Sequence, residues 1–102
     1  MVGCKVNIVE AFDLDWYPGW CKAVLKDCNE VEHILGEKLP VIGLEERDVH
    51  SLPVETYIAV EVVKDLGDTV EIDTAVPYGI ETQDGKTRFV VRKEMINNDE
   101  QV

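Results

Sequence analysis

Cysteine and histidine most often carry chemistry in proteins, and this chain has few of either. The cysteines are Cys4, Cys21 and Cys28, and the histidines are His33 and His50. Six residues separate Cys21 from Cys28 and four separate Cys28 from His33, which matches no zinc-finger or zinc-ribbon spacing. A zinc site would also need a fourth ligand, such as His50 or Cys4. We therefore expect no metal site and no cofactor.

Nucleophilic catalysis needs a Cys or Ser, a base beside it and a group that orients the base. Cys28 with His33 or His50 is the only cysteine arrangement. Ser51 is the only serine, and it follows His50 without a G-x-S-x-G turn. The sequence also lacks the glycine-rich loops G-x-x-x-x-G-K-[ST] and G-x-G-x-x-G that bind phosphate. These absences predict a protein that is not an enzyme.

Asp13 and Asp15 form an Asp-x-Asp pair of the kind that begins calcium loops. An EF-hand loop from Asp13 would need a ligand at its fifth position, Gly at its sixth and Glu at its twelfth. Those positions hold Tyr17, Pro18 and Val24. We therefore expect the two carboxylates to flank a turn and to remain solvated.

Residues 12–20 contain four of the seven aromatic residues of the chain: Phe12, Trp16, Tyr17 and Trp20. Rigid rings beside carboxylates in a loop have the composition of a binding hot spot, or of a platform for a planar or sugar ligand. The alternative is that one or two rings close the open end of a small barrel. That alternative suits Trp20, which begins a strand, and Phe12, whereas Trp16 and Tyr17 are the candidates for surface contacts.

The charge of the chain is strongly acidic. It has 21 acidic and 10 basic residues, a formal net charge of −11 and a sequence pI of about 4.4. Residues 27–84 alone contain 15 acids and 3 bases. Such a field attracts basic partners and repels nucleic acid, although an acidic surface also serves solubility alone. With Trp16 and Tyr17, the carboxylates expected at a protein-binding surface are Asp13, Asp15, Glu45, Glu46, Asp48, Glu61, Glu71 and Asp73.

One short stretch has the opposite sign. Lys86, Arg88, Arg92 and Lys93 lie close together with no acid between residues 85 and 93. Alternation along a strand places Arg88 and Arg92 on one face and Lys93 on the other. We expect these bases to pair with acidic neighbours across a sheet rather than to bind phosphate.

The elements that position these residues are predicted to be strands, because apolar and polar residues alternate with period two. The alternating runs are residues 4–8, 21–26, 31–35, 54–62, 69–73 and 87–92. Turn signals separate them at Pro18-Gly19, 27–30, 66–68 and Asp84-Gly85, the last being the strongest hairpin signal. Residues 45–52 are the only helical pattern, at most two turns before Pro53.

Six short strands with tight turns favour a mainly β fold, a small antiparallel barrel of the SH3-like or OB-like kind. We expect one β-rich domain over residues 1–96 and a polar, flexible tail over 97–102. No signal peptide or run of 18 apolar residues occurs, so neither secretion nor a membrane partner is expected. The odd cysteine count predicts free thiols in the cytoplasm, although one disulfide in a secreted protein is an alternative.

Together these features favour a non-catalytic, acidic protein-binding module. It would act as an inhibitor or immunity-type protein that masks a basic partner, such as a toxin or a nucleic-acid enzyme. The alternative is a small-molecule or peptide-binding β-barrel that uses the aromatic loop 12–20. The sequence leaves the oligomeric state open.

Overall fold

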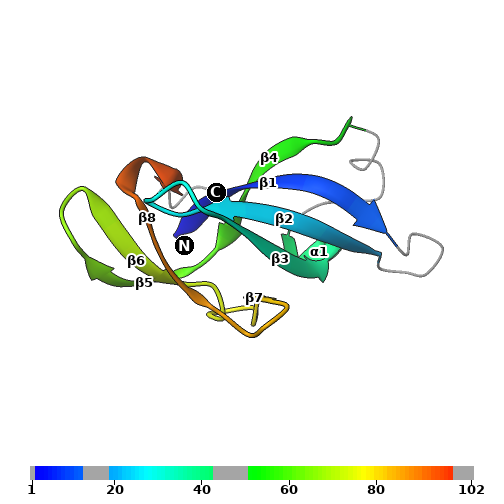
Figure 1. Cartoon of the computed structure of the whole chain (residues 1–102). Helices are drawn as coiled ribbons and strands as arrows, with labels where there is room; N and C mark the ends of the chain where they lie inside the picture. Colours follow the sequence, from blue (N-terminus) through cyan, green and yellow to red (C-terminus); the bar gives the residue numbers. More distant parts are fainter. Residues whose placement is uncertain (1, 13–18, 43–50, 98–102) are drawn as a thin grey trace.

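The computed structural model describes residues 2–12, 19–42 and 51–97 (Figure 1). The described part consists mainly of strands, as the alternation predicts. Its strands are β1 (Gly3–Phe12), β2 (Trp20–Lys26), β3 (Glu32–Lys38), β4 (Val54–Ala59), β5 (Glu61–Asp65), β6 (Thr69–Asp73), β7 (Glu81–Thr82), β8 (Arg88–Arg92) and β9 (Ile96–Asn97). Its short helices are α1 (Leu39–Ile42) and η2 (Lys93–Met95).

These strands form two antiparallel sheets. The larger sheet has the order β4-β1-β2-β3-β7, with β9 added to β1, and the smaller one has the order β5-β6-β8. The β5–β6 hairpin lies at one end of the molecule and the far ends of β1 and β2 at the other (Figure 1). The mainly β, antiparallel prediction is confirmed, but the strands among the described residues do not close into a barrel.

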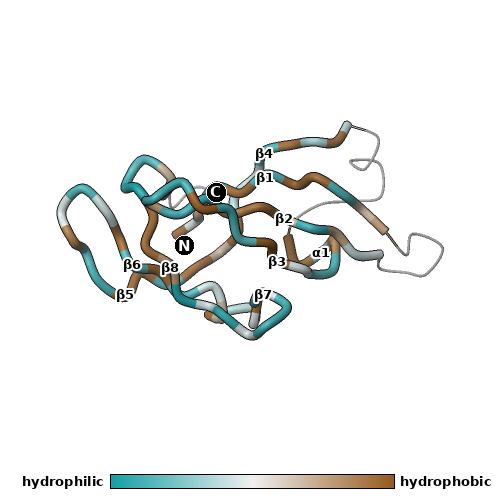
Figure 2. The backbone as a smooth tube through the Cα atoms, in the orientation of Figure 1, coloured by the Kyte–Doolittle hydropathy of each residue, from teal (hydrophilic) through white to brown (hydrophobic). Residues whose placement is uncertain are grey.

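The core lies between the inner faces of the two sheets. Apolar and polar residues alternate along the strands (Figure 2), and the apolar set points inward. Removing each Leu, Ile or Val side chain from water contributes about 1.5–3 kcal/mol. The buried apolar residues are Cys4, Val6, Ile8, Cys21, Ala23, Leu25, Leu35, Leu39, Ile42, Ile58, Val60, Val70, Ile72, Ile80, Phe89 and Val91.

The predicted strand 54–62 is in fact two strands in different sheets. The chain crosses at Val60, which is buried and whose N–H donates to the Val2 carbonyl at 3.0 Å. A register shift between Val62 and Lys64 follows in β5, and Val62 is 39% exposed. The expectation that Val62 shares the buried face of Ile58 is therefore wrong, because alternation does not continue through a change of sheet.

Two tight turns have the same pattern of backbone hydrogen bonds. In one, Asp27 N–H donates to the Val31 carbonyl and Glu30 N–H to the Asp27 carbonyl. In the other, Thr82 and Gly85 N–H groups donate to the Lys86 and Thr82 carbonyls. Val31, the first residue of the predicted strand 31–35, is 51% exposed because it belongs to the first turn and β3 begins only at Glu32.

The turn predicted at Asp84-Gly85 is confirmed, but the pairing of its flanking residues is not. β7 pairs with β3, whereas β8 pairs with β6 in the other sheet. The strands before and after this turn therefore belong to different sheets. A local turn signal does not reveal which strand each of them pairs with. Residues 27–30 do close a hairpin, between β2 and β3.

Polar contacts join the sheets. Cys28 N–H donates to the Val90 carbonyl of β8 at 2.8 Å, and Arg92 pairs with Glu30 at 3.0 Å. Beyond β6, the buried Thr74 hydroxyl donates to the Ile80 carbonyl at 2.7 Å. The first two contacts connect β8 to the β2–β3 turn of the larger sheet, and the third joins the two ends of the β6–β7 segment.

Two further predictions concern segments that lie partly outside the described residues. The helix expected near 45–52 falls largely on residues 43–50, which lie outside the described residues, while α1 ends at Ile42. Asn97, expected in the tail, is the last residue of β9 and pairs with Gly3. Residues 98–102 lie outside the description.

Candidate functional site

The predicted site residues divide into two groups. Seven lie outside the described residues: Asp13, Asp15, Trp16, Tyr17, Glu45, Glu46 and Asp48. The remaining three, Glu61, Glu71 and Asp73, come together on the smaller sheet. Glu61 lies directly opposite Asp73, and Glu71 occupies the same strand as Asp73, two residues away. Because directly paired and alternate residues share a face, the three carboxylates lie on one outer face.

These three carboxylates are not equally available to a partner. Asp73 accepts the Ala75 N–H at 2.9 Å and lies 3.8 Å from Arg88 Nε, and its side chain is only 14% exposed. Glu61 is exposed and Glu71 is half-buried. Asp73 therefore belongs mainly to the turn after β6, whereas Glu61 is the member that presents its charge to solvent.

Three of the four basic residues in the stretch 86–93 pair with acids, as predicted. Arg88 pairs with Asp73 across the sheet, Arg92 with Glu30, and Lys93 with Asp65 at 3.1 Å. The fourth base of the group, Lys86, lies over the Phe89 ring at 5.1 Å. Most of the positive charge in this stretch is therefore neutralised within the protein.

Two of the three cysteines, Cys4 and Cys21, are buried and poorly reactive. All three are free, and burial raises the pKa of Cys4 to about 12 and that of Cys21 to about 11, the latter with the help of Glu37. Thiols with such pKa values stay protonated at neutral pH and are poor nucleophiles and ligands. No group of residues suited to hold a metal occurs within the described ranges.

His33 is engaged in a structural contact. Its Nε2 lies 2.8 Å from Asp27 Oδ2, and its ring packs on Phe89 with centroids 4.9 Å apart. This hydrogen bond, aided by the N–H groups of Val31 and Asn29, lowers the pKa of Asp27. The pair therefore braces the turn beside β8, a role that the sequence did not indicate.

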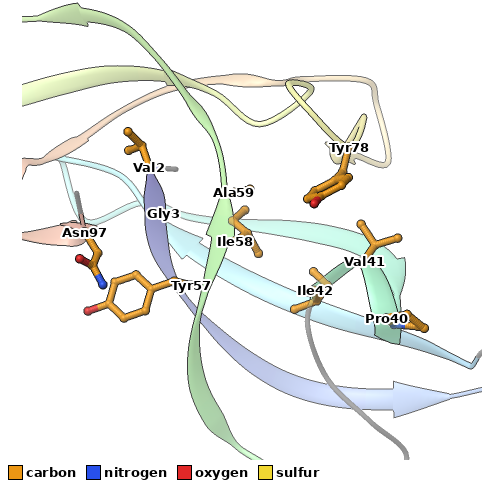
Figure 3. A pocket seen from close by; sticks show the side chains of 10 residues that line it. All are labelled: Val2, Gly3, Pro40, Val41, Ile42, Tyr57, Ile58, Ala59, Tyr78 and Asn97. Atoms are coloured by element: carbon orange, nitrogen blue, oxygen red, sulfur yellow. The ribbon is translucent and has the colours of Figure 1, made fainter. Parts of the chain in front are cut away.

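The structure also shows an apolar cleft beside β4 (Figure 3). Its volume is about 410 Å³. Tyr57 and Tyr78, which are 41% and 51% exposed, contribute its two rings. Lining residues come from five segments: Val2, Gly3, Pro40, Val41, Ile42, Tyr57, Ile58, Ala59, Tyr78 and Asn97.

Sequence analysis missed this cleft. Alternation correctly placed Tyr57 and Ile58 on opposite faces of a strand. Tyr78, however, lies in the turn after Pro77, where no periodicity applies. The signal that could have pointed to it was an aromatic residue within a Pro-Tyr-Gly turn, outside any core-forming pattern.

Compared with protein-family models, curated proteins and solved structures, the chain gives no significant match in any of the three. Within the described ranges, no helix has the length and apolar character needed to cross a membrane. The inference of function therefore depends on the geometry and charge described above.

Proposed function

We propose that this protein is a non-catalytic binding module that docks its acidic surface onto a basic protein and masks it, as an inhibitor or immunity-type protein does. The observation that carries this proposal is the surplus of exposed carboxylates after internal pairing. Four of the basic side chains lie in ion pairs with acids, namely Lys22, Arg88, Arg92 and Lys93, and Lys5 lies at the longer distance of 3.9 Å from Glu55. What remains at the surface is therefore mainly negative.

Several exposed acids take part in no ion pair among the described residues: Glu32, Glu61, Asp68, Glu81 and Glu94. Solvated carboxylates of this kind carry little desolvation penalty in the free protein, and they can pair with Lys or Arg on the surface of a partner. Opposed fields also speed the encounter of the two proteins. The free thiols support a reducing, cytoplasmic setting.

The first test is affinity capture from the host lysate followed by elution with a salt step. We expect a stoichiometric basic protein that is released by added salt, because exposed charges are screened within about 8 Å at physiological ionic strength. The purified partner should lose its own activity when this protein is added. A partner that stays bound irrespective of salt, or that remains fully active in the complex, would contradict the proposal.

A second candidate function is supported by the cleft at Tyr57 and Tyr78, which has the size and lining of a small-ligand site. In that case the protein binds an apolar small molecule, and binding is nearly indifferent to salt. A thermal-shift screen of aromatic compounds on the wild type and on Tyr78→Ala distinguishes this function from the first.

A further inference from the structure

The outer edge of β4 carries backbone N–H and C=O groups that point away from β1. β4 pairs with β1 from Val54 opposite Ile8 to Ala59 opposite Gly3, and Val60 N–H donates to Val2 in continuation of that ladder. In an antiparallel ladder, residues alternate between pointing their N–H and C=O at the partner strand and away from it. Because the backbone N–H of Val60 points toward β1, the backbone N–H and C=O groups of Ala59, Tyr57 and Glu55 point to the open edge. No strand among the described residues pairs with that edge.

Apart from the single charge of Glu55, this edge lacks the features that usually prevent strand pairing. Proteins protect open edges with charged residues, prolines and bulges. β5 shows two of these, since it contains Glu61, Lys64 and Asp65 and has an irregular register. β4 contains neither proline nor Lys, and its pairing with β1 is regular over six residues.

Apolar side chains lie on both faces of β4. The Tyr57 side chain lies over Gly3 on one face, and Ile58 lies on the other, where the cleft also contains Val41 and Tyr78 (Figure 3). A strand added to β4 would direct its successive side chains alternately to these two faces. Strand addition takes affinity from main-chain hydrogen bonds and specificity from the side chains met on each face.

The charge at this edge is negative and accessible. The Glu55 side chain is 65% exposed, and its nearest cation, Lys5 Nζ, lies 3.9 Å away. An exposed pair at that separation contributes little, so the carboxylate can turn to a cation on an added strand. Opposite charges directly across a ladder stabilise the pairing.

We propose that the open edge of β4 binds an extended, basic and apolar segment of the partner as an additional antiparallel strand. Lys or Arg lies opposite Glu55, and apolar residues lie opposite Tyr57 and Ile58. Read along the partner, this gives the pattern apolar-apolar-x-Lys. The inference deepens the proposed function and rests on it, because it takes the partner to be basic.

The test uses a displayed library of nine-residue peptides with one fixed lysine and randomised neighbours. Selection is made on the wild-type protein alone, and the enriched peptides are then tested on Ala59→Pro. Proline deletes the outward N–H without disturbing the pairing with β1, as edge strands allow. Ala59→Val is the matched control, because it keeps the N–H and valine is favoured in strands.

Enriched peptides should carry apolar residues two and three positions before the lysine. Their affinity is measured by fluorescence anisotropy. It should fall about tenfold or more in Ala59→Pro, because the proline loses a hydrogen bond and its ring blocks the edge sterically. It should stay unchanged in Ala59→Val. Glu55→Lys should weaken binding more than Glu61→Lys, although both change the net charge equally. Circular dichroism and thermal melting confirm that each variant folds.

The possible failures are distinguishable. Peptides that bind Ala59→Pro as well as wild type overturn strand addition, as does an equal loss in Glu55→Lys and Glu61→Lys, which would leave the acidic field and the proposed function intact. A dimer that Ala59→Pro dissociates in sedimentation, without peptide enrichment, assigns the edge to a second copy and overturns the proposal. Peptides that bind at the edge irrespective of salt contradict the proposed function while strand addition stands.

Discussion

Two turns of this protein are built alike but are secured differently. The turns at 27–31 and 82–86 share the same backbone hydrogen bonds, and each contains one residue in the left-handed conformation. In the second turn that residue is Gly85, with φ 85°, and in the first it is Glu30, with φ 64°. This pattern, a type I turn followed by a left-handed residue, normally favours glycine.

The difference lies in what surrounds each turn. The first is attached to β8 by Cys28 N–H on the Val90 carbonyl and by Glu30 on Arg92. The second is held by its own side chains, with the Thr82 hydroxyl accepting from Lys86 N–H and donating to the Asp84 carboxylate. A residue can stay in an unfavourable conformation where its surroundings over-determine it. Glu30 is therefore tolerated where tertiary contacts fix the turn.

The largest expected effect comes from proline at the first loop position of each turn, which accepts proline well. Cys28→Pro removes the donor to Val90 and places its ring against that carbonyl, so unfolding free energy should fall by about 1–3 kcal/mol. Gln83→Pro removes no described hydrogen bond, so stability should stay unchanged or rise by up to about 1 kcal/mol. Chemical denaturation of both variants measures the difference.

Cys28→Ala is the control for the first variant, because it removes the thiol and keeps the N–H. An equal loss in Cys28→Ala and Cys28→Pro would show that the thiol, and not the attachment to β8, stabilises the turn. Equal behaviour of the two proline variants would remove the distinction between the turns altogether.

A smaller effect is expected from exchanging glycine and alanine at the left-handed positions. Glu30→Gly should be more stable than Glu30→Ala by about 1 kcal/mol, and Gly85→Ala should lose about as much, because a Cβ disfavours this conformation. No atom lies within 4 Å of a Cβ built at Gly85 or at Gly36. Gly36→Ala, in strand β3, is thus the control and should gain about 0.5 kcal/mol. Alanine variants as stable as the glycine ones would contradict the left-handed assignment.

These turns also show what a sequence can predict. Gly85 made its turn predictable, because glycine is favoured where φ is positive. This turn was the strongest hairpin signal in the sequence. Glu30 carries no such signal, since its conformation depends on Arg92 and Val90, which are distant in sequence. The strands were predictable for the same local reason, because alternation reports which side of a strand is buried.

The change of sheet at Val60 was not predictable, since one alternating pattern continues from Val54 to Val62. The candidate site follows the same division. Alternation placed Glu61, Glu71 and Asp73 outward, but the turn that occupies Asp73 and the cleft between Tyr57 and Tyr78 arise from contacts between segments far apart in the chain. Local patterns carry no record of such contacts.

The smallest expected effect is a difference between the two turns in how much their aspartates, Asp27 and Asp84, stabilise the fold as the pH changes. Hydrogen bonds lower the pKa of both Asp27 and Asp84 from the usual 3.8. A carboxylate whose pKa is lower in the folded state adds stability that is complete above the unfolded pKa and disappears as pH falls through the folded one. Wild type should therefore exceed Asp27→Asn in melting temperature at pH 6, and the excess should shrink below about pH 4.

Asp84→Asn should show the same sign with a smaller excess. Asp84 is exposed to solvent, whereas the Asp27 side chain is only 17% exposed and lies against His33, and water screens exposed charges. Thermal melts of the three proteins from pH 6 to pH 2.5 measure the two differences. An excess for Asp84 that equals or surpasses that for Asp27 would mean that the low exposure of Asp27 and its hydrogen bond to His33 add nothing beyond the local hydrogen bonds of the turn.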